Sequence, residues 1–146
     1  MRNKKGFTLI EMLVVIAIIS VLVSIVIPTV KSYTMKAKAS ADAANLRIVL
    51  GLLNVDVVNG DKTVQEIIDS SPNPTSVMDP GAKLYAVFET PGFVDVFYIN
   101  DSTNTCYGID YLAEIAANGE DSPNLGAIGT AKPTIEGGTW YVVSGG

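Results

Sequence analysis

Histidine is absent from this sequence of 146 residues, and cysteine occurs once, as Cys106. The chain therefore lacks the side chain that most often serves as a general base, and one thiol cannot complete a zinc site. A nucleophile elbow and a phosphate-binding P-loop are also missing from the sequence. We predict that the protein is not an enzyme, holds no cofactor or metal, and forms no disulfide within the chain. Cys106 is predicted to be a small buried residue in a strand.

Charge is missing from the run between Met12 and Val30, which is mostly apolar. At about 1.5 Å per residue, a helix of this length crosses the roughly 30 Å hydrocarbon core of a bilayer. Glu11 stands at the edge of the run, and an ionised carboxylate inside a membrane costs about 2.5 to 3.5 kcal/mol on insertion scales. No lysine or arginine lies within helical reach inside the run, and Lys5 is nearly two turns back. We therefore predict that the partner of Glu11 comes from outside this stretch.

Three simpler interpretations compete for the same segment. A secretory signal would use the basic residues Arg2, Lys4 and Lys5 and be cut at Ala37-Lys38-Ala39, but it needs a shorter apolar core. A plain single-span anchor leaves Glu11 unexplained. A buried core helix would be shorter and less uniformly apolar than this run.

The segment Lys5–Glu11, with the apolar run behind it, resembles the class III signal of type IV pilins and pseudopilins. Its pattern is a short basic leader, a glycine, an aromatic residue, three further residues and a glutamate, followed by about twenty apolar residues. The resemblance implies that a membrane prepilin peptidase cuts after Gly6 and that the new amino group on Phe7 is methylated. It also implies that Glu11 is needed for assembly into a homo-oligomeric helical filament, driven by an assembly platform and its ATPase.

This resemblance divides the chain into four parts. Residues 1–6 would be the cleaved leader, 7–30 the transmembrane and filament-core half of a long helix, 31–60 its amphipathic half, and 61–146 a globular head. Leader removal would place a cationic amino group on Phe7, one turn before Glu11. The Phe7 ammonium of one subunit would then neutralise Glu11 of its neighbour and fix their register.

Pro28 lies inside the helical pattern and has no N–H to donate to the carbonyl of Ser24. The hydroxyls of Ser20, Ser24 and Thr29 are close enough to compensate for the missing bond. Members of the resembled family commonly have a proline at this place, in a segment that loosens in the filament, and a glycine where this chain has Ser20. The resemblance therefore implies melting near Pro28, and a simple kink fits the sequence equally well.

Beyond Lys31 the apolar residues become periodic. They recur at steps of three and four residues, which predicts one apolar stripe on a helix: Ala39, Ala43, Leu46, Leu50, Leu53 and Val57. Packing against the chain's own sheet is the expected use of this stripe, rather than a coiled coil. We predict a helix from about Phe7 to Val58, which stops at Asn59-Gly60.

The remainder predicts an α+β fold in which the long N-terminal helix packs on an antiparallel sheet of about four strands. The expected strands cover residues 83–89, 92–99, 105–109 and 139–143, with a hairpin turn at Thr90-Pro91-Gly92. Short helices are expected over 61–68, where Thr63 and Glu66 have capping-box spacing, and over 110–117, closed by Gly119. Residues 120–138 are expected to be an exposed connecting loop.

The formal net charge is −5, and removal of the leader leaves 7 basic residues against 15 acidic ones, a net charge of −8. This balance argues against direct binding of nucleic acid. The basic residues Lys31, Lys36 and Lys38 are expected to meet lipid headgroups or acidic neighbours. A calcium site would use Asp101 or Glu120-Asp121, but no EF-hand loop is present and a solvated acidic face is the preferred interpretation.

The sequence thus predicts a structural subunit of a type IV pilus. It would be a single-pass protein of the cytoplasmic membrane before assembly and part of an extracellular filament afterwards, serving adhesion, motility or DNA uptake. The first alternative is a pseudopilin of a type II secretion or competence system. The second is a membrane-tethered extracellular binding module, for which a processed Phe7 and Glu11 would have no use.

Overall fold

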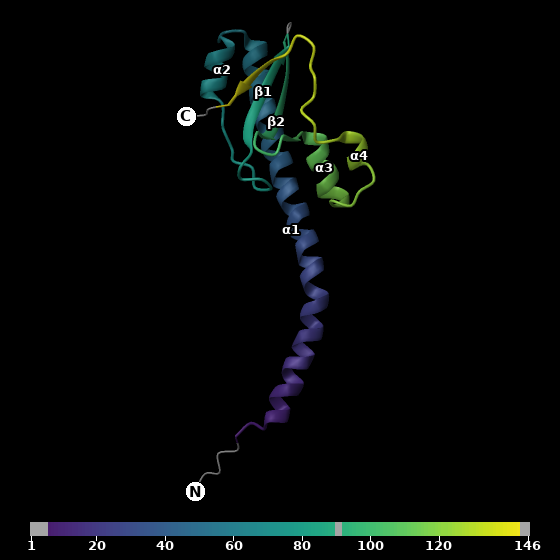
Figure 1. The fold of residues 1–146 in the computed structure, drawn as a ribbon. Helices are drawn as coiled ribbons and strands as arrows, with labels where there is room; N and C mark the ends of the chain where they lie inside the picture. Colours follow the sequence, from purple (N-terminus) through teal and green to yellow (C-terminus); the bar gives the residue numbers. More distant parts are fainter. Residues whose placement is uncertain (1–5, 90–91, 144–146) are drawn as a thin grey trace. The chain divides into compact units, whose positions relative to one another are not determined.

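The computed structural model describes residues 6–89 and 92–143, and it divides into two compact units, Met1–Thr34 and Met35–Gly146. Figure 1 shows the elements in chain order: α1 (Leu9–Asn59), α2 (Val64–Ser70), β1 (Lys83–Glu89), β2 (Phe93–Asn100), β3 (Thr105–Tyr107), α3 (Ile109–Asn118), α4 (Leu125–Ile128) and β4 (Thr139–Val142). This arrangement confirms the predicted α+β fold. The basic leader residues and the turn residues Thr90 and Pro91 lie outside the described residues.

In the first unit, α1 exposes every side chain from Leu9 to Thr34. Its hydroxyls turn back onto the helix backbone: Ser20 Oγ donates to the carbonyl of Ile16, and Ser24 Oγ to that of Val21, both at 2.7 Å. These bonds satisfy the polar groups and leave an apolar outer surface. Among the described residues, α1 is the one helix long and apolar enough to span a membrane, with a mean hydropathy of 3.0 over its most apolar window.

Pro28 lies within α1 without ending it. The neighbouring hydroxyls do not take over the hydrogen bond that Pro28 cannot donate to Ser24, because Ser24 binds the carbonyl of Val21 and Thr29 binds that of Val26. The compensation expected from these hydroxyls is therefore wrong for the carbonyl of Ser24. The loosening expected at Pro28 stays a prediction.

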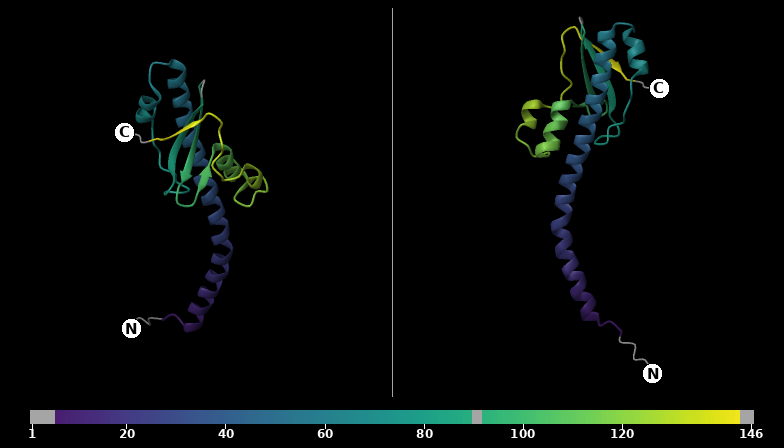
Figure 2. Two further views of the ribbon diagram at one scale, coloured as in Figure 1. Left: turned by 45° about the horizontal axis from the view of Figure 1, so that its top comes forward. Right: turned by 180° about the vertical axis from the view of Figure 1, so that it is seen from behind.

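In the second unit, four antiparallel strands form one sheet in the order β3-β2-β1-β4. Side chains alternate between its faces, so that on β2 Val96 and Tyr98 belong to the main core, whereas Asp95 and Phe97 point to the opposite side. The second half of α1 packs against the core face, as the view from behind in Figure 2 shows. We call the side that carries Asp95 and Phe97 the outer face.

The stripe of α1 that packs on the sheet is close to the predicted one. Leu50 and Val57 are partly buried there, and the fully buried members are Ala39, Asp42, Ala43, Leu46, Val49 and Leu53. Asp42 and Val49 were not predicted to belong to this stripe. The helix ends as expected, because Gly60 adopts a left-handed φ of +68° and donates its N–H to the carbonyl of Asp56 at 3.3 Å.

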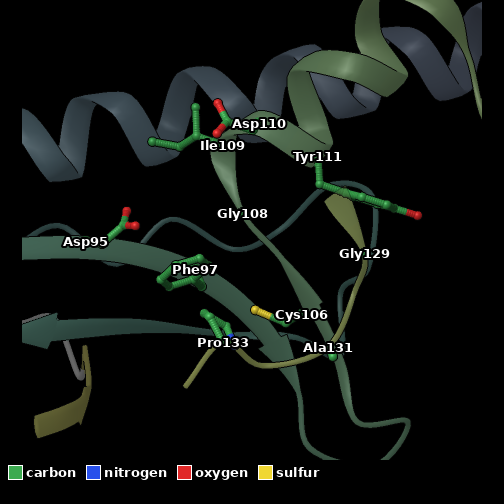
Figure 3. Close-up of a pocket in the computed structure, with 10 residues that line it drawn as sticks. All are labelled: Asp95, Phe97, Cys106, Gly108, Ile109, Asp110, Tyr111, Gly129, Ala131 and Pro133. Carbon is green, nitrogen blue, oxygen red and sulfur yellow. The ribbon is translucent and has the colours of Figure 1, made fainter. Parts of the chain in front are cut away.

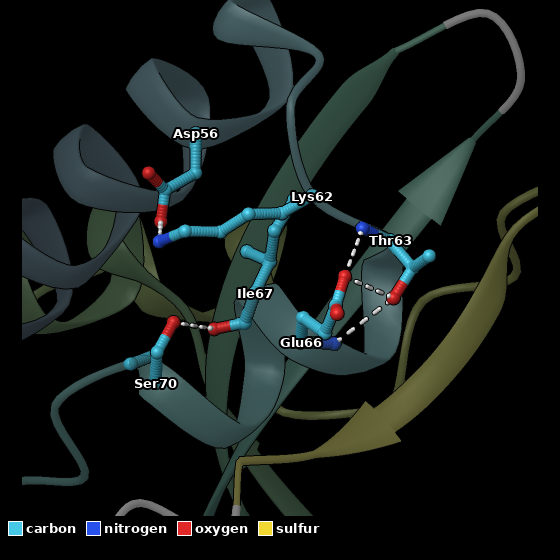
Figure 4. Close-up of polar contacts among 7 residues, drawn as sticks. Asp56, Lys62, Thr63, Glu66, Ile67 and Ser70 are labelled. Carbon is cyan, nitrogen blue, oxygen red and sulfur yellow. Dashed lines mark hydrogen bonds and ion pairs between the residues drawn. The ribbon is translucent and has the colours of Figure 1, made fainter.

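The capping box predicted at Thr63 and Glu66 is present and fixes the start of α2 (Figure 4). The N–H and the hydroxyl of Thr63 each donate to Glu66 Oε2 at 2.8 Å. Because Thr63 is the cap, α2 begins at Val64 and continues to Ser70, which corrects the expected range 61–68. The third strand is also shorter than predicted, because α3 already begins at Ile109.

The predicted loop over residues 120–138 contains α4 and then crosses the outer face of the sheet. Thr130 accepts a hydrogen bond at 2.7 Å from the N–H of Cys106, and Lys132 Nζ lies 4.3 Å from the centroid of the Trp140 ring. A Cβ at Gly138 would come within 2.9 Å of Val87 Cγ2, so only glycine lets the chain approach this closely. The loop therefore helps to bury Val87 on the outer face.

Asp42 is a fully buried carboxylate that ties α1 to the segment before β1. Its oxygens accept hydrogen bonds from Ser76 Oγ at 2.7 Å, Val77 N at 2.7 Å and Met78 N at 2.9 Å. Three donors compensate much of the cost of burying the charge.

We predict that Asp42→Ala lowers the free energy of unfolding by about 3 kcal/mol, because it leaves two backbone N–H groups without an acceptor. The measurement is chemical denaturation of the detergent-solubilised chain, followed through the fluorescence of Trp140. Asp61→Ala, at an exposed acidic residue, is the matched control and should change the free energy of unfolding by less than about 0.5 kcal/mol. Equal stability of the two variants would contradict the role given to Asp42.

Candidate functional site

The start of α1 is held by a second capping box, formed by Thr8 and Glu11. The N–H and the hydroxyl of Thr8 donate to Glu11 Oε2 at 2.7 and 2.8 Å, and the N–H of Glu11 faces Thr8 Oγ1 at 3.3 Å. This is the same reciprocal arrangement as that of Thr63 and Glu66. Within a single chain, Glu11 therefore has a hydrogen-bond partner three residues away.

Sequence reasoning missed this contact because it looked for an opposite charge. The signal was nevertheless present, since Thr8-Leu9-Ile10-Glu11 has the threonine-to-glutamate spacing that was used correctly for α2. The carboxylate also lies at the positive end of the helix dipole, which favours its charged form. Neither effect supplies a full positive charge, and within the described residues no cation forms an ion pair with Glu11.

The N–H and the hydroxyl of Thr8 both donate to Oε2 of Glu11, so the described contacts leave Oε1 unoccupied. Glu11 is exposed in the single chain. Its carboxylate can thus accept a further hydrogen bond from another molecule without breaking the capping box.

Gly6 and Phe7 precede α1 and are not helical. Phe7 is 79% exposed, and a Cβ placed on Gly6 would meet nothing within 4 Å. The peptide bond between them is consequently accessible on an irregular segment, as a protease requires. The structure brings Glu11 close to Thr8, while Pro28 lies several turns further along α1.

Asp101, the first candidate for a calcium ligand, already has partners within the protein. It accepts hydrogen bonds from the Tyr85 hydroxyl at 2.9 and 3.0 Å and pairs with Lys83 at 3.5 Å. Across residues 6–89 and 92–143, no cluster of three or more acidic, histidine or cysteine side chains is arranged to hold a metal ion.

Cys106 is a free thiol buried in β3, which confirms the prediction that it is a small buried residue in a strand. Burial disfavours the thiolate and raises the pKa of Cys106 to about 11. A thiol in this state reacts slowly and behaves as a small apolar side chain.

Residues 1–27 match the family described as the prokaryotic N-terminal methylation motif. Along more of its length the chain is similar to the fimbrial protein of Moraxella nonliquefaciens, with 31% identity over 114 residues that cover 65% of this chain and 73% of that protein. It is also similar to the type IV major alpha-pilin of Moraxella bovis, with 31% identity over 103 residues that cover 65% of this chain and 64% of that protein. No solved structure matches the chain significantly.

The fold and the site define a small α+β protein whose first helix begins with a capping box, formed by Thr8 and Glu11, and has the length and apolar character of a membrane span. Together with the similarity to these relatives, this shows that the chain belongs to the type IV pilin and pseudopilin superfamily. It is a structural subunit rather than an enzyme.

We predict that Cys106 reacts with Ellman's reagent at least about 100-fold more slowly in the folded protein than in the unfolded chain at pH 8. The raised pKa reduces the thiolate fraction by about this factor, and burial slows access further. The measurement compares labelling of the detergent-solubilised protein before and after addition of guanidinium chloride. Rapid labelling of the folded protein would contradict the burial of Cys106.

Proposed function

We propose that the protein is the pilin of a type IV pilus, inserted in the cytoplasmic membrane and polymerised into an extracellular filament. The single observation that carries this proposal is the continuity of the N-terminal motif with one long apolar helix, in a chain similar to a fimbrial protein and a pilin. Adhesion, motility and DNA uptake are proposed as activities of the assembled filament.

In this proposal residues 1–6 are a leader that a prepilin peptidase removes, and residues 7–30 span the membrane before they enter the filament core. Residues 31–60 are the helix half that carries the globular head, 61–146. An assembly platform and its ATPase extract the subunit from the membrane. The accessible bond between Gly6 and Phe7 supports cleavage at this place.

Glu11 is proposed to act in assembly through the oxygen that the capping box leaves free. Cleavage creates an ammonium group on Phe7, next to the Thr8 cap, and Phe7 of one subunit approaches Glu11 of its neighbour. Oε1 of Glu11 accepts a hydrogen bond from this ammonium group, while Thr8 still donates to Oε2 and holds the side chain in place. The pair neutralises both charges in the apolar filament core, so that subunits in the wrong register are penalised.

Leader cleavage is tested by the mass of the mature N-terminus. We expect the filament protein to begin with methylated Phe7, and we expect Gly6→Val to retain the full leader because a branched side chain stands at the cleaved bond. Gly126→Ala is the matched control: the site is exposed, a Cβ there meets nothing within 4 Å, and the variant should be processed normally. A mature start near Ser40 would identify a conventional secretory signal, and an intact Met1 a plain anchor.

The role of Glu11 is tested by comparing two substitutions in sheared filament preparations. Glu11→Ala should remain in the membrane fraction and reduce filament yield at least tenfold. Glu11→Gln keeps an oxygen for the Thr8 cap but has no charge, so it should also fail if neutralisation of Phe7 is required.

Glu66→Ala is the control, because it removes the equivalent capping box from α2 and should leave filament yield within twofold. Full assembly of Glu11→Gln would show that capping, rather than charge, is what the filament needs. Full assembly of Glu11→Ala would remove Glu11 from the proposed mechanism altogether.

A further inference from the structure

The outer face of the second unit carries a pocket of about 330 Å³ that the proposed function does not use. Figure 3 shows that it lies between β2 and β3, the start of α3 and the segment after α4. Its volume is at the lower end of the range for small-molecule sites, about 300 to 1,000 Å³. Asp110, Gly129 and Ala131 belong to its lining and are exposed, so the pocket opens to solvent.

Two carboxylates, Asp95 on β2 and Asp110 in the first turn of α3, face the same side of the pocket (Figure 3). Neither forms an ion pair within residues 6–89 and 92–143. Asp95 is half-buried, and the hydrogen bond that it accepts comes from the N–H of Val96 at 2.8 Å. Burial and then the negative charge of Asp110 raise the pKa of Asp95. A cation beside these two groups would favour their charged forms.

A lysine of the same face is held elsewhere. Lys132 belongs to the loop that crosses the outer face, and its Nζ lies 4.3 Å from the centroid of the Trp140 ring and 5.5 Å from that of the Tyr85 ring. Both rings attract the ammonium group through their π faces. The two carboxylates are therefore available to a cation from another molecule.

The remaining wall determines which kind of cation fits. Phe97, Ile109 and Pro133 line it with apolar side chains. A metal ion such as calcium needs six to eight oxygen ligands, and among the described residues no third acidic side chain joins the two carboxylates. An organic cation can instead bury an apolar stem against this wall. A guanidinium head suits the pocket best, because it is weakly hydrated, lies flat on aromatic rings and has five N–H donors for two carboxylates.

We propose that this pocket binds an organic cation that has a guanidinium head on a short apolar stem. The head donates hydrogen bonds to Asp95 and Asp110, and the stem lies along Phe97 and Pro133. The pocket is on the side of the sheet opposite α1, because Phe97 alternates with the core residue Val96. The site does not depend on the proposed filament, and a filament with α1 at its core would carry the pocket on its outside.

Binding is tested with n-butylguanidinium on the full chain in detergent, followed by nuclear magnetic resonance. The amide signals of Gly108 and Gly129 report on the pocket that they line, and those of Gly51 and Gly60 report on the rest of the chain. We expect saturable shifts at the first pair, with a dissociation constant of about 1 to 10 mM for so small a ligand. The neutral n-butylurea, which has the same stem and a planar head, should bind at least about tenfold more weakly.

The two carboxylates are tested by substitutions that keep their shape. Asp95→Asn and Asp110→Asn should each raise the dissociation constant of n-butylguanidinium at least about fivefold, because each removes a charged acceptor. Asp61→Asn, at an exposed acidic residue outside the pocket, is the matched control and should change it less than about twofold. The fluorescence of Trp140 identifies a misfolded variant. If Asp95→Asn does not fold, Asp110→Asn at its exposed position decides the test alone.

Three results would overturn the proposed site. Equal binding of n-butylurea would remove the role of charge, and equal shifts at Gly51 and Gly60 would remove the location. An equal loss of binding in Asp61→Asn would show a general effect of net charge. Absence of filaments bears on the proposed function and leaves this site unaffected.

A second probe distinguishes the two sources of a guanidinium head. Binding of the blocked tripeptide acetyl-Gly-Arg-Gly-amide at least as tight as that of n-butylguanidinium would assign the pocket to arginine side chains of another protein. Weaker binding of the tripeptide would assign it to a free guanidino compound. Both results support the guanidinium site, and absence of binding by either probe would overturn it.

Discussion

The first half of α1 exposes apolar side chains, and the second half buries one side against the sheet. The rest of the structure is arranged around this change along the helix. Between Leu9 and Thr34 every side chain of α1 is exposed, and its hydroxyls are turned back onto the helix backbone. From Ala39 onward one side of the same helix becomes the centre of a core to which β1, β2, α2 and α3 contribute buried side chains. Asp42 joins this second half to the chain before β1, next to the place where the sheet packs on the helix.

Local sequence patterns predicted most of this fold. The steps of three and four residues from Ala39 to Leu53 identified the packed stripe, and the threonine-to-glutamate spacing at Thr63 identified the cap of α2. Asp42 could not be predicted in the same way, because its donors lie 34 to 36 residues further along the chain and a carboxylate reads as an interruption of an apolar stripe. The burial of Val87 under the loop after α4 could not be predicted from the sequence either, since it depends on long-range packing around Gly138.

The candidate site shows where sequence reasoning succeeds and where it stops. Glu11 was recognised as unusual from its apolar surroundings alone, and the capping box with Thr8 explains how one chain accommodates it. That contact is local and had a sequence signal, but the search was for a cation. The partner proposed for assembly belongs to another copy, so neither the sequence nor one chain contains the contact. The roles of Gly6 and Phe7 rest on the resemblance and on the accessibility of the bond between them.

The sheet order β3-β2-β1-β4 places the last strand of the chain beside the first one. Tyr85 and Val142 pair across this boundary, although 57 residues separate them in the sequence. The hairpin of β1 and β2 can form locally, whereas the free edge of β1 is covered only when the end of the chain is in place.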